Sequence, residues 1–159
     1  MNREAERNST AGPGDDALVA EAQKGSQAAF GEIVRRYQRA VYRVAWALVR
    51  NDADADDLAQ EALLRVVAHL DRWQRGPALT WVLGVARNVC WEEIRRRTRR
   101  RTDPAAEPPV APTADAFGAV DTVRLLAALP YEQREALVLT QLIGLPYAQA
   151  ADIVDCPIG

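Results

Sequence analysis

Arginine is concentrated in one stretch of this sequence, TWVLGVARNVCWEEIRRRTRRR, which covers residues 80–101. Residues 87–101 hold seven arginines and only two acids, Glu92 and Glu93, which leaves a net charge of +5. A helix with such a basic end is suited to binding a phosphate backbone. The alternative is a solvated helix end whose arginines are favoured by the helix dipole. Six arginines within residues 95–101 exceed what capping requires, so the sequence favours a nucleic-acid partner.

The first half of this stretch must anchor the basic end. Apolar residues recur at helical spacing from Trp81 to Ile94, which predicts one helix whose first half faces a core. Thr80 is the candidate N-cap of this helix. Residues 74–79, QRGPAL, contain a Gly-Pro pair and therefore predict a loop that leads directly into the helix.

Three further helices are predicted before this loop, over residues 16–24, 26–50 and 52–73. In the second, Ser26 is the N-cap and apolar residues step by three and four, which predicts one buried face. Tyr42 and Trp46 lie four residues apart on the same side of that helix, where they could form an exposed aromatic ledge. No alternating apolar run and no hairpin turn occurs, so the fold class is all-α.

The third helix begins with a patch of acidic residues. Residues 51–61, NDADADDLAQE, carry five acids and no base, a local charge of −5. Acids at a helix start often only complement its dipole, but Leu64 is also predicted to face outward among charged residues. One acidic and one basic patch on a chain of net charge −2 suggest two partners of opposite charge.

Composition excludes several classes of protein. Cys90 and Cys156 are far apart and His69 is the single histidine, so neither a disulfide framework nor a metal site is expected. The N-terminus has no apolar signal segment, and no apolar run reaches the ~20 residues of a membrane span. There is no nucleophile–base set, cofactor motif or phosphate-binding glycine loop. We therefore expect a cytoplasmic protein that is not an enzyme, needs no cofactor and does not insert into membranes.

The composition also changes along the chain and predicts two modules. Residues 1–15 are polar and predict a disordered tail, and residues 102–116 hold four prolines and predict an extended linker. Residues 16–101 form the first module. Residues 117–159 predict a small module of short helices that resembles the first half of a helix-turn-helix. Within it, a helix over 131–144 is expected to face a core with Ala136, Leu137, Leu139, Leu142 and Ile143.

Several motifs in this order resemble a known family. The segments DDLAQEALLR, LTWVLGVARN, the arginine run and LPYEQRE are together similar to the group IV, extracytoplasmic-function (ECF) sigma factors of bacterial RNA polymerase. The resemblance implies two helical domains, a sigma-2-like bundle and a sigma-4-like helix-turn-helix, joined by the Pro-rich linker. It also implies that a full second domain would continue past Gly159 into the recognition helix.

The resemblance further implies roles for particular residues. The acidic helix would dock on the clamp helices of core RNA polymerase, through Asp57, Leu58, Gln60, Glu61, Leu64 and Arg65. The loop and the basic helix would bind and melt the minus-ten promoter element, through Arg75, Thr80, Trp81, Arg87, Asn88, Trp91, Arg95, Arg96, Arg97, Arg99 and Arg100. Trp91 is unusual for the family at its position, and is either an added stacking surface or part of the core.

The expected function is therefore that of an alternative sigma factor, with core RNA polymerase, promoter DNA and an anti-sigma factor as partners. One alternative is a helix-turn-helix regulator that does not act through core polymerase, which would leave the acidic helix unexplained. Another is an interaction protein or helical scaffold. Binding to core polymerase separates these classes.

Overall fold

The computed structural model describes residues 14–74, 76–101, 126 and 128–155. In this part of the chain every regular element is helical, which confirms the predicted all-α class. The predicted tail, the linker, Arg75 and the predicted helix that begins near residue 117 fall largely or wholly outside the described residues. The elements are α1 (Asp15–Gln23), α2 (Gln27–Val49), α3 (Asp52–Ala68), the 3₁₀ turn η1 (Leu70–Arg72), α4 (Ala78–Arg101), α6 (Tyr131–Leu137), the π-helical turn η2 (Val138–Leu142) and α7 (Tyr147–Val154).

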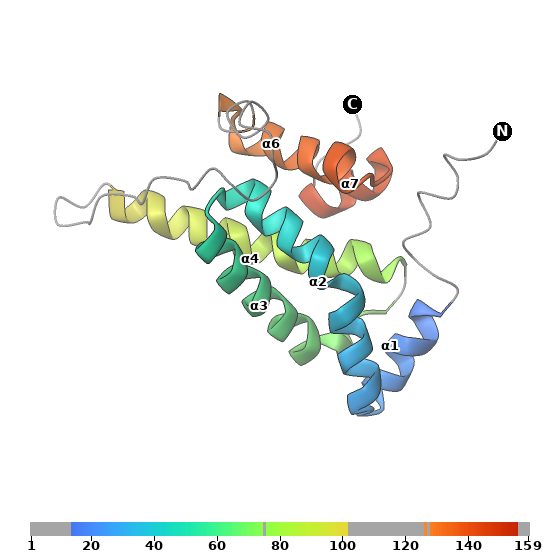
Figure 1. The fold of residues 1–159 in the computed structure, drawn as a ribbon. Coiled ribbons are helices and arrows are strands. Elements are labelled where there is room, and N and C mark those ends of the chain that lie inside the picture. The colour runs from blue at the N-terminus through green and yellow to red at the C-terminus, as the bar shows by residue number, and fades with distance from the viewer. Residues whose placement is uncertain (1–13, 75, 102–125, 127, 156–159) are drawn as a thin grey trace.

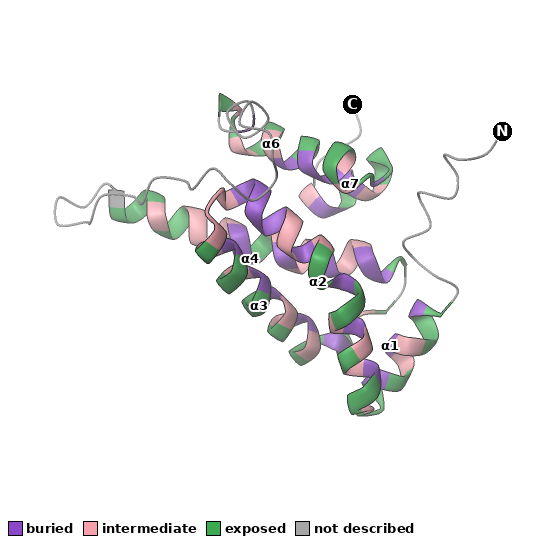
Figure 2. Ribbon diagram, in the orientation of Figure 1, coloured by how far each residue is buried: buried purple, intermediate pink, exposed green. Residues whose placement is uncertain are grey.

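Helices α2, α3 and α4 pack against one another in a bundle, with α1 at one end of it (Figure 1). The core includes Ile33, Tyr37 and Val41 of α2, which the three–four spacing had predicted, and Val82 and Leu83 of α4. The buried side of each helix faces its neighbours and the exposed side faces outward (Figure 2). Apolar burial of this kind is the main stabilising term for such a bundle.

Local signals set where α2 and α3 begin and end. The Ser26 side chain accepts a hydrogen bond from the backbone N–H of Ala29 (3.3 Å), as the predicted N-cap should. At the far end, Arg50 adopts a left-handed conformation (φ 56°) that stops the helix. Asn51 then caps α3 by accepting from the N–H of Asp54 (3.0 Å). This two-residue connection makes α2 and α3 direct neighbours.

The predicted aromatic ledge on α2 is wrong for Trp46. Its ring is buried, and its indole N–H donates to a carboxylate oxygen of Asp52 (2.7 Å). The chain reversal between α2 and α3 brings this acceptor to the N–H edge of the ring, so the polar group of Trp46 has a hydrogen-bond partner within the structure. Tyr42, four residues earlier, is half-buried.

Helices α6 and α7 lie across α2 and α4 (Figure 1). Val138 and Leu139 are buried there, whereas Leu137 and Leu142 are exposed. The predicted core face of this segment was therefore wrong at Leu137, Leu142 and Ala136, which is also exposed. The buried side of this segment is set by Glu135, Val138 and Leu139, which turns Ala136 and Leu137 outward, and the π-helical turn over 138–142 changes the helical period only for the residues that follow.

Candidate nucleic-acid and protein interface

Helix α4 is the element that carries most of the predicted DNA-binding residues. It begins at Ala78, with the N–H of Trp81 bonded to the carbonyl of Pro77 (3.3 Å), so the prediction that Thr80 is the N-cap is wrong. Thr80 lies inside the first turn, and its hydroxyl is hydrogen-bonded to the side-chain oxygen of Gln149 on α7 (3.0 Å). Ala78 and Leu79 are buried and fix the start of the helix in the core.

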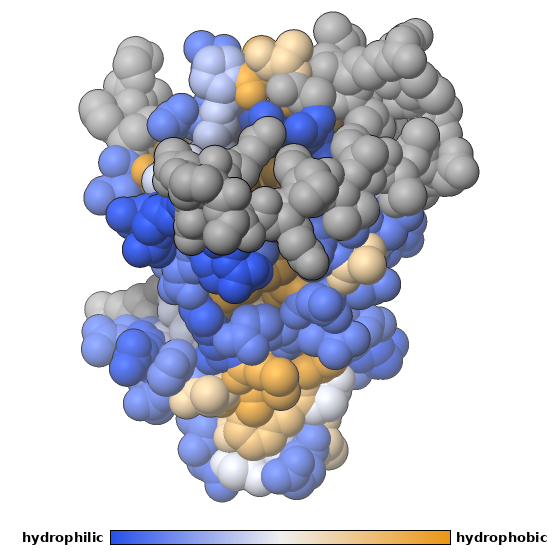
Figure 3. Space-filling view, turned by 90° about the vertical axis from the view of Figure 1, so that its left-hand side faces the viewer, coloured by the Kyte–Doolittle hydropathy of each residue, from blue (hydrophilic) through white to orange (hydrophobic). Residues whose placement is uncertain are grey.

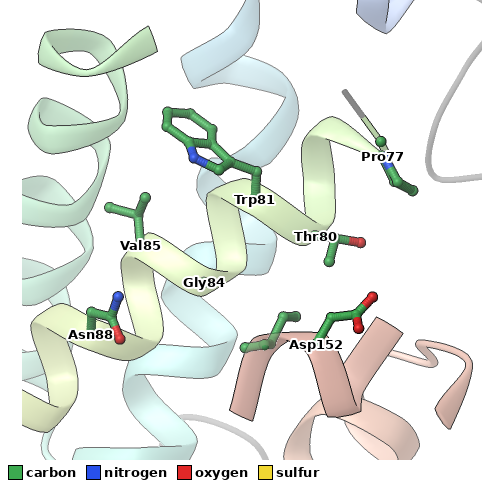
Figure 4. Close-up of a pocket in the computed structure, with 9 residues that line it drawn as sticks. Pro77, Thr80, Trp81, Gly84, Val85, Asn88 and Asp152 are labelled. Carbon is green, nitrogen blue, oxygen red and sulfur yellow. The ribbon is translucent and has the colours of Figure 1, made fainter. Parts of the chain in front are cut away.

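A cleft of about 400 Å³ lies along this part of α4. Figure 4 shows its labelled residues on α4 and, across from Thr80, Asp152 of α7. The cleft is open to solvent and mixes an aromatic ring with polar groups. It is lined by Gly76, Pro77, Thr80, Trp81, Gly84, Val85, Asn88, Asp152 and Ile153. Three predicted DNA-binding residues, Thr80, Trp81 and Asn88, are thus brought together at one surface hollow.

Arg87 and Trp91, the next predicted residues along α4, are half-buried and each contacts a side chain of α6. Arg87 forms an ion pair with Glu135, whose side chain is only 3% exposed. The Trp91 ring contacts the Tyr131 ring, with 4.7 Å between ring centroids. The guanidinium groups of Arg87 and Arg95 lie 6.0 and 5.9 Å from the Trp91 ring, within cation–π range.

The pKa values of both partners in the Arg87–Glu135 ion pair differ from their ordinary values. Hydrogen bonding to Glu135 raises the pKa of Arg87, which therefore stays charged. Burial raises the pKa of Glu135 above its ordinary value, although Arg87 acts in the opposite direction. Glu135 was not predicted from the sequence. It is separated from Arg87 by 48 residues in the sequence, and a local sequence pattern does not predict a contact between residues so far apart in the chain.

The basic end of α4 is partly neutralised by neighbouring acids. Arg96 pairs with Glu93 (2.6 Å), and Arg97 pairs with both Glu93 and Asp54 of α3 (2.7 Å each). Arg95, Arg99 and Arg100 are exposed. Figure 3 views the molecule from the side to which this end projects, where hydrophilic side chains surround a hydrophobic patch in the lower half of the view.

The residues predicted to bind polymerase divide into two groups on α3. Leu64 is 67% exposed, and Asp57, Gln60 and Glu61 are exposed as well. Leu58 is half-buried and packs against the core. Arg65, also half-buried, bridges Glu61 (2.7 Å) and Glu92 of α4 (2.8 Å). The exposed group therefore forms an acidic surface with one large apolar side chain, while Leu58 and Arg65 also hold α3 in place.

Comparison with known proteins decides the family. Residues 33–100 match the family Sigma-70 region 2, and residues 120–159 match Sigma-70, region 4. The chain is 38% identical over 150 residues to the ECF RNA polymerase sigma factor SigC of Mycobacterium tuberculosis, covering 90% of this chain and 80% of SigC. This chain is an ECF RNA polymerase sigma factor. It acts as an alternative sigma factor in transcription initiation, as the motifs had predicted.

Other relatives agree with this family. The ECF sigma-E factor of Escherichia coli is 29% identical over 163 residues, covering 91% of this chain and 85% of sigma-E. Among solved structures, the sigma factor RpoE of Bartonella quintana, crystallised with the anti-sigma factor NepR, is 27% identical with a TM-score of 0.69, covering 80% of this chain and 84% of that one. CnrH in complex with the cytosolic domain of CnrY shares the fold (TM-score 0.68, covering 90% and 84%).

Two structural tests bear on other kinds of site. Within the described ranges, no cluster of three or more histidine, cysteine or acidic side chains could hold a metal ion. In that same part of the chain, none of the helices combines the length and the hydropathy that crossing a membrane requires.

Proposed function

We propose that this sigma factor docks on the clamp helices of core RNA polymerase through the exposed side of α3. The observation that carries this proposal is the exposure of Leu64, 67%, at the end of an exposed stripe of α3 that also holds Asp57, Gln60 and Glu61. An apolar side chain surrounded by charge is typical of a small protein interface, in which the apolar group supplies binding energy and the charges set orientation and rate.

The DNA-binding part of the proposal places the minus-ten element along α4. Holding a base outside the duplex stack costs a few kcal/mol. Stacking on an aromatic side chain returns ~1–3 kcal/mol per base. The cleft at Thr80, Trp81 and Asn88 would receive such a base, and the arginines from Arg87 onward would hold the phosphates of the strand. Arg75, outside the described residues, belongs to the same predicted surface.

The proposed organisation follows the sequence: a tail at 1–15, a polymerase- and DNA-binding domain at 16–101, a linker at 102–116 and a sigma-4-like domain at 117–159. We propose a cytoplasmic protein that performs no chemical step itself and uses no cofactor. Its partners would be core RNA polymerase, promoter DNA and an anti-sigma factor. The structure of the Bartonella relative with its anti-sigma factor supports the last of these.

The docking proposal is tested with the double variant Asp57→Arg, Leu64→Asp. Binding to core RNA polymerase is measured by fluorescence anisotropy of the labelled sigma factor. It should weaken by at least about 100-fold, because Leu64→Asp removes an apolar contact and Asp57→Arg reverses the sign of a charge. Neither side chain is buried, so the circular dichroism spectrum and the thermal unfolding temperature should stay close to those of the wild type.

Asp71→Arg is the matched control for this experiment. Asp71 is exposed on η1, outside α3 and outside the residues predicted to bind polymerase, and its replacement makes the same charge change as Asp57→Arg. It should leave polymerase affinity within about twofold of wild type. Wild-type affinity in the double variant would refute docking through α3.

A further inference from the structure

The side-chain amide of Gln23 connects α1 to the segment that leads into the α4 cleft. Its nitrogen donates to the carbonyl of Leu70 in η1 (2.9 Å) and to the carbonyl of Trp73, which follows that turn (3.2 Å). A glutamine amide nitrogen carries two hydrogens, so one side chain can serve both acceptors. Gln23 is thus bonded to the last turn before the loop of residues 74–77, across 47 and 50 residues of sequence.

Helix α1 is itself anchored in the bundle, so Gln23 projects from a fixed element. Val19 and Ala22 of α1 are buried in the core. At the other end of the helix, the buried carboxylate of Asp15 forms an ion pair with Arg36 of α2. Apolar burial together with a charge-assisted hydrogen bond leaves α1 little freedom to shift. The bonds from Gln23 therefore fix the end of η1 relative to the bundle.

The loop that follows η1 is short, and its last residues line the cleft. Trp73 has an extended conformation, and α4 starts at Ala78, whose side chain is buried. Gly76 adopts a φ of 96°, which suits glycine, and the ring of Pro77 fixes its own φ. Because few dihedral angles are free to adjust, a displaced Trp73 carbonyl would displace Gly76 and Pro77, which line the cleft (Figure 4).

We infer that Gln23 is a positioning residue for base selection in this cleft. It contacts no base itself and acts through the two carbonyls, which set where the loop lies and therefore the shape of the cleft. The inference rests on the proposed binding of the minus-ten element along α4. It adds a residue of the first helix that determines how sharply the cleft distinguishes one base from another, since discrimination requires a site that is held in one geometry.

The test uses the holoenzyme formed with core RNA polymerase and a pool of single-stranded oligodeoxynucleotides with a randomised central segment. Sequencing of the bound fraction gives the enrichment of each base at each position, and the fraction bound by core polymerase alone is the blank. Trp81→Ala changes the cleft directly. The position at which this variant loses enrichment therefore identifies the base that binds in the cleft.

Gln23→Met keeps the length of the side chain and removes both hydrogen-bond donors. At the position identified by Trp81→Ala, it should reduce the enrichment of the preferred base by at least about fivefold, because the loop is no longer held in one place. The other positions should stay within about twofold of wild type, since phosphate contacts and distant base contacts are unchanged.

Two further variants control for the change in chemistry. Gln38→Met makes the same replacement at an exposed position of α2 and should leave every enrichment within about twofold of wild type. Gln23→Lys again provides a donor for the two carbonyls and should recover most of the selectivity. Its added charge attracts all sequences alike and does not change the enrichment of one base over another.

Hydrogen exchange in the free protein measures the positioning step separately. The backbone amides of Arg72 and Trp73 bond to the carbonyls of His69 and Leu70 within the turn. In Gln23→Met they should exchange at least about fivefold faster, while the amides of α2 keep their rates. Unchanged exchange would overturn the inference. Faster exchange with unchanged base enrichment would overturn it as well, because Gln23 would then hold η1 without affecting base selection.

The outcomes also separate this inference from the proposed function. If Trp81→Ala loses enrichment at one position and Gln23→Met does not, the inference is wrong while the proposed DNA-binding role of α4 stands. If the wild type enriches no base, or if Trp81→Ala matches the wild type at every position, base recognition in the cleft fails and the inference fails with it. Polymerase docking through α3 is judged by its own assay.

Discussion

At the scale of single residues, Cys90 shows how strongly the bundle core controls reactivity. The side chain is buried on α4, and burial, with a smaller effect of the nearby Glu135 carboxylate, raises the pKa of its thiol to about 12. Since the thiolate is the reactive form, only a minute fraction of Cys90 is reactive near neutral pH. The thiol therefore acts as a small apolar core group.

This gives a prediction for thiol chemistry. In a Cys156→Ser variant, a disulfide reagent such as 5,5′-dithiobis-(2-nitrobenzoate) should not modify Cys90 in the folded protein at pH 8, and should modify it once urea unfolds the chain. Reactivity should rise with pH, because the folded-state pKa lies above the unfolded value of ~8.5. Rapid modification of the native protein at pH 8 would contradict the burial of Cys90.

At the scale of elements, the basic end of α4 contains arginines in different states. Arg96 and Arg97 are held by Glu93 and Asp54, so binding of a phosphate at either guanidinium, as proposed, would require the exchange of these partners. Arg95 has no carboxylate partner among the described residues and lies over the Trp91 ring. Arg95 would therefore meet a phosphate without first giving up an ion pair, unlike Arg96 and Arg97.

The corresponding prediction concerns salt dependence. Arg95→Ala should weaken single-stranded DNA binding and reduce the slope of log affinity against log salt by ~0.7, the value for one phosphate contact on a single strand. Arg39→Ala is the control, since Arg39 is exposed on α2 and lies outside the predicted surface. A wild-type slope in Arg95→Ala would show that Arg95 does not contact phosphate.

At the scale of the whole molecule, Arg134 joins the second group of helices to the first. Its guanidinium donates to the carbonyls of Leu126 (2.7 Å) and Leu129 (3.0 Å), and also to that of Leu48 near the end of α2 (3.1 Å). Carbonyls in the last turn of a helix lack partners within it. Arg134 satisfies one of them from a distant part of the chain, although burial lowers its own pKa.

Replacement of Arg134 by Met should therefore destabilise the whole protein. We expect the free energy of unfolding to fall by about 3 kcal/mol, because several buried carbonyls lose a charged donor together. Urea denaturation followed by circular dichroism measures this. Gln133→Met, at an exposed neighbouring position, should change it by less than ~0.5 kcal/mol, and equal values for the two variants would contradict the role of Arg134.

The sequence by itself determined what depends on near neighbours in the chain. The three–four spacing in α2, the Ser26 cap and the charge of the stretch ending at Arg101 are local properties, and the ordered motifs identified the family. The all-α class and the outward position of Leu64 followed from the same periodicity.

Only the tertiary structure decided where distant side chains meet. The N–H of Trp46 finds its partner in Asp52 beyond a chain reversal, and the partners of Trp91 and Arg87 on α6 lie 40 and 48 residues further along the chain. Such contacts follow from helix packing, which no local spacing encodes. The sequence therefore located the basic helix that is predicted to bind DNA, and the fold placed an aromatic ring and a carboxylate of α6 against two of its residues.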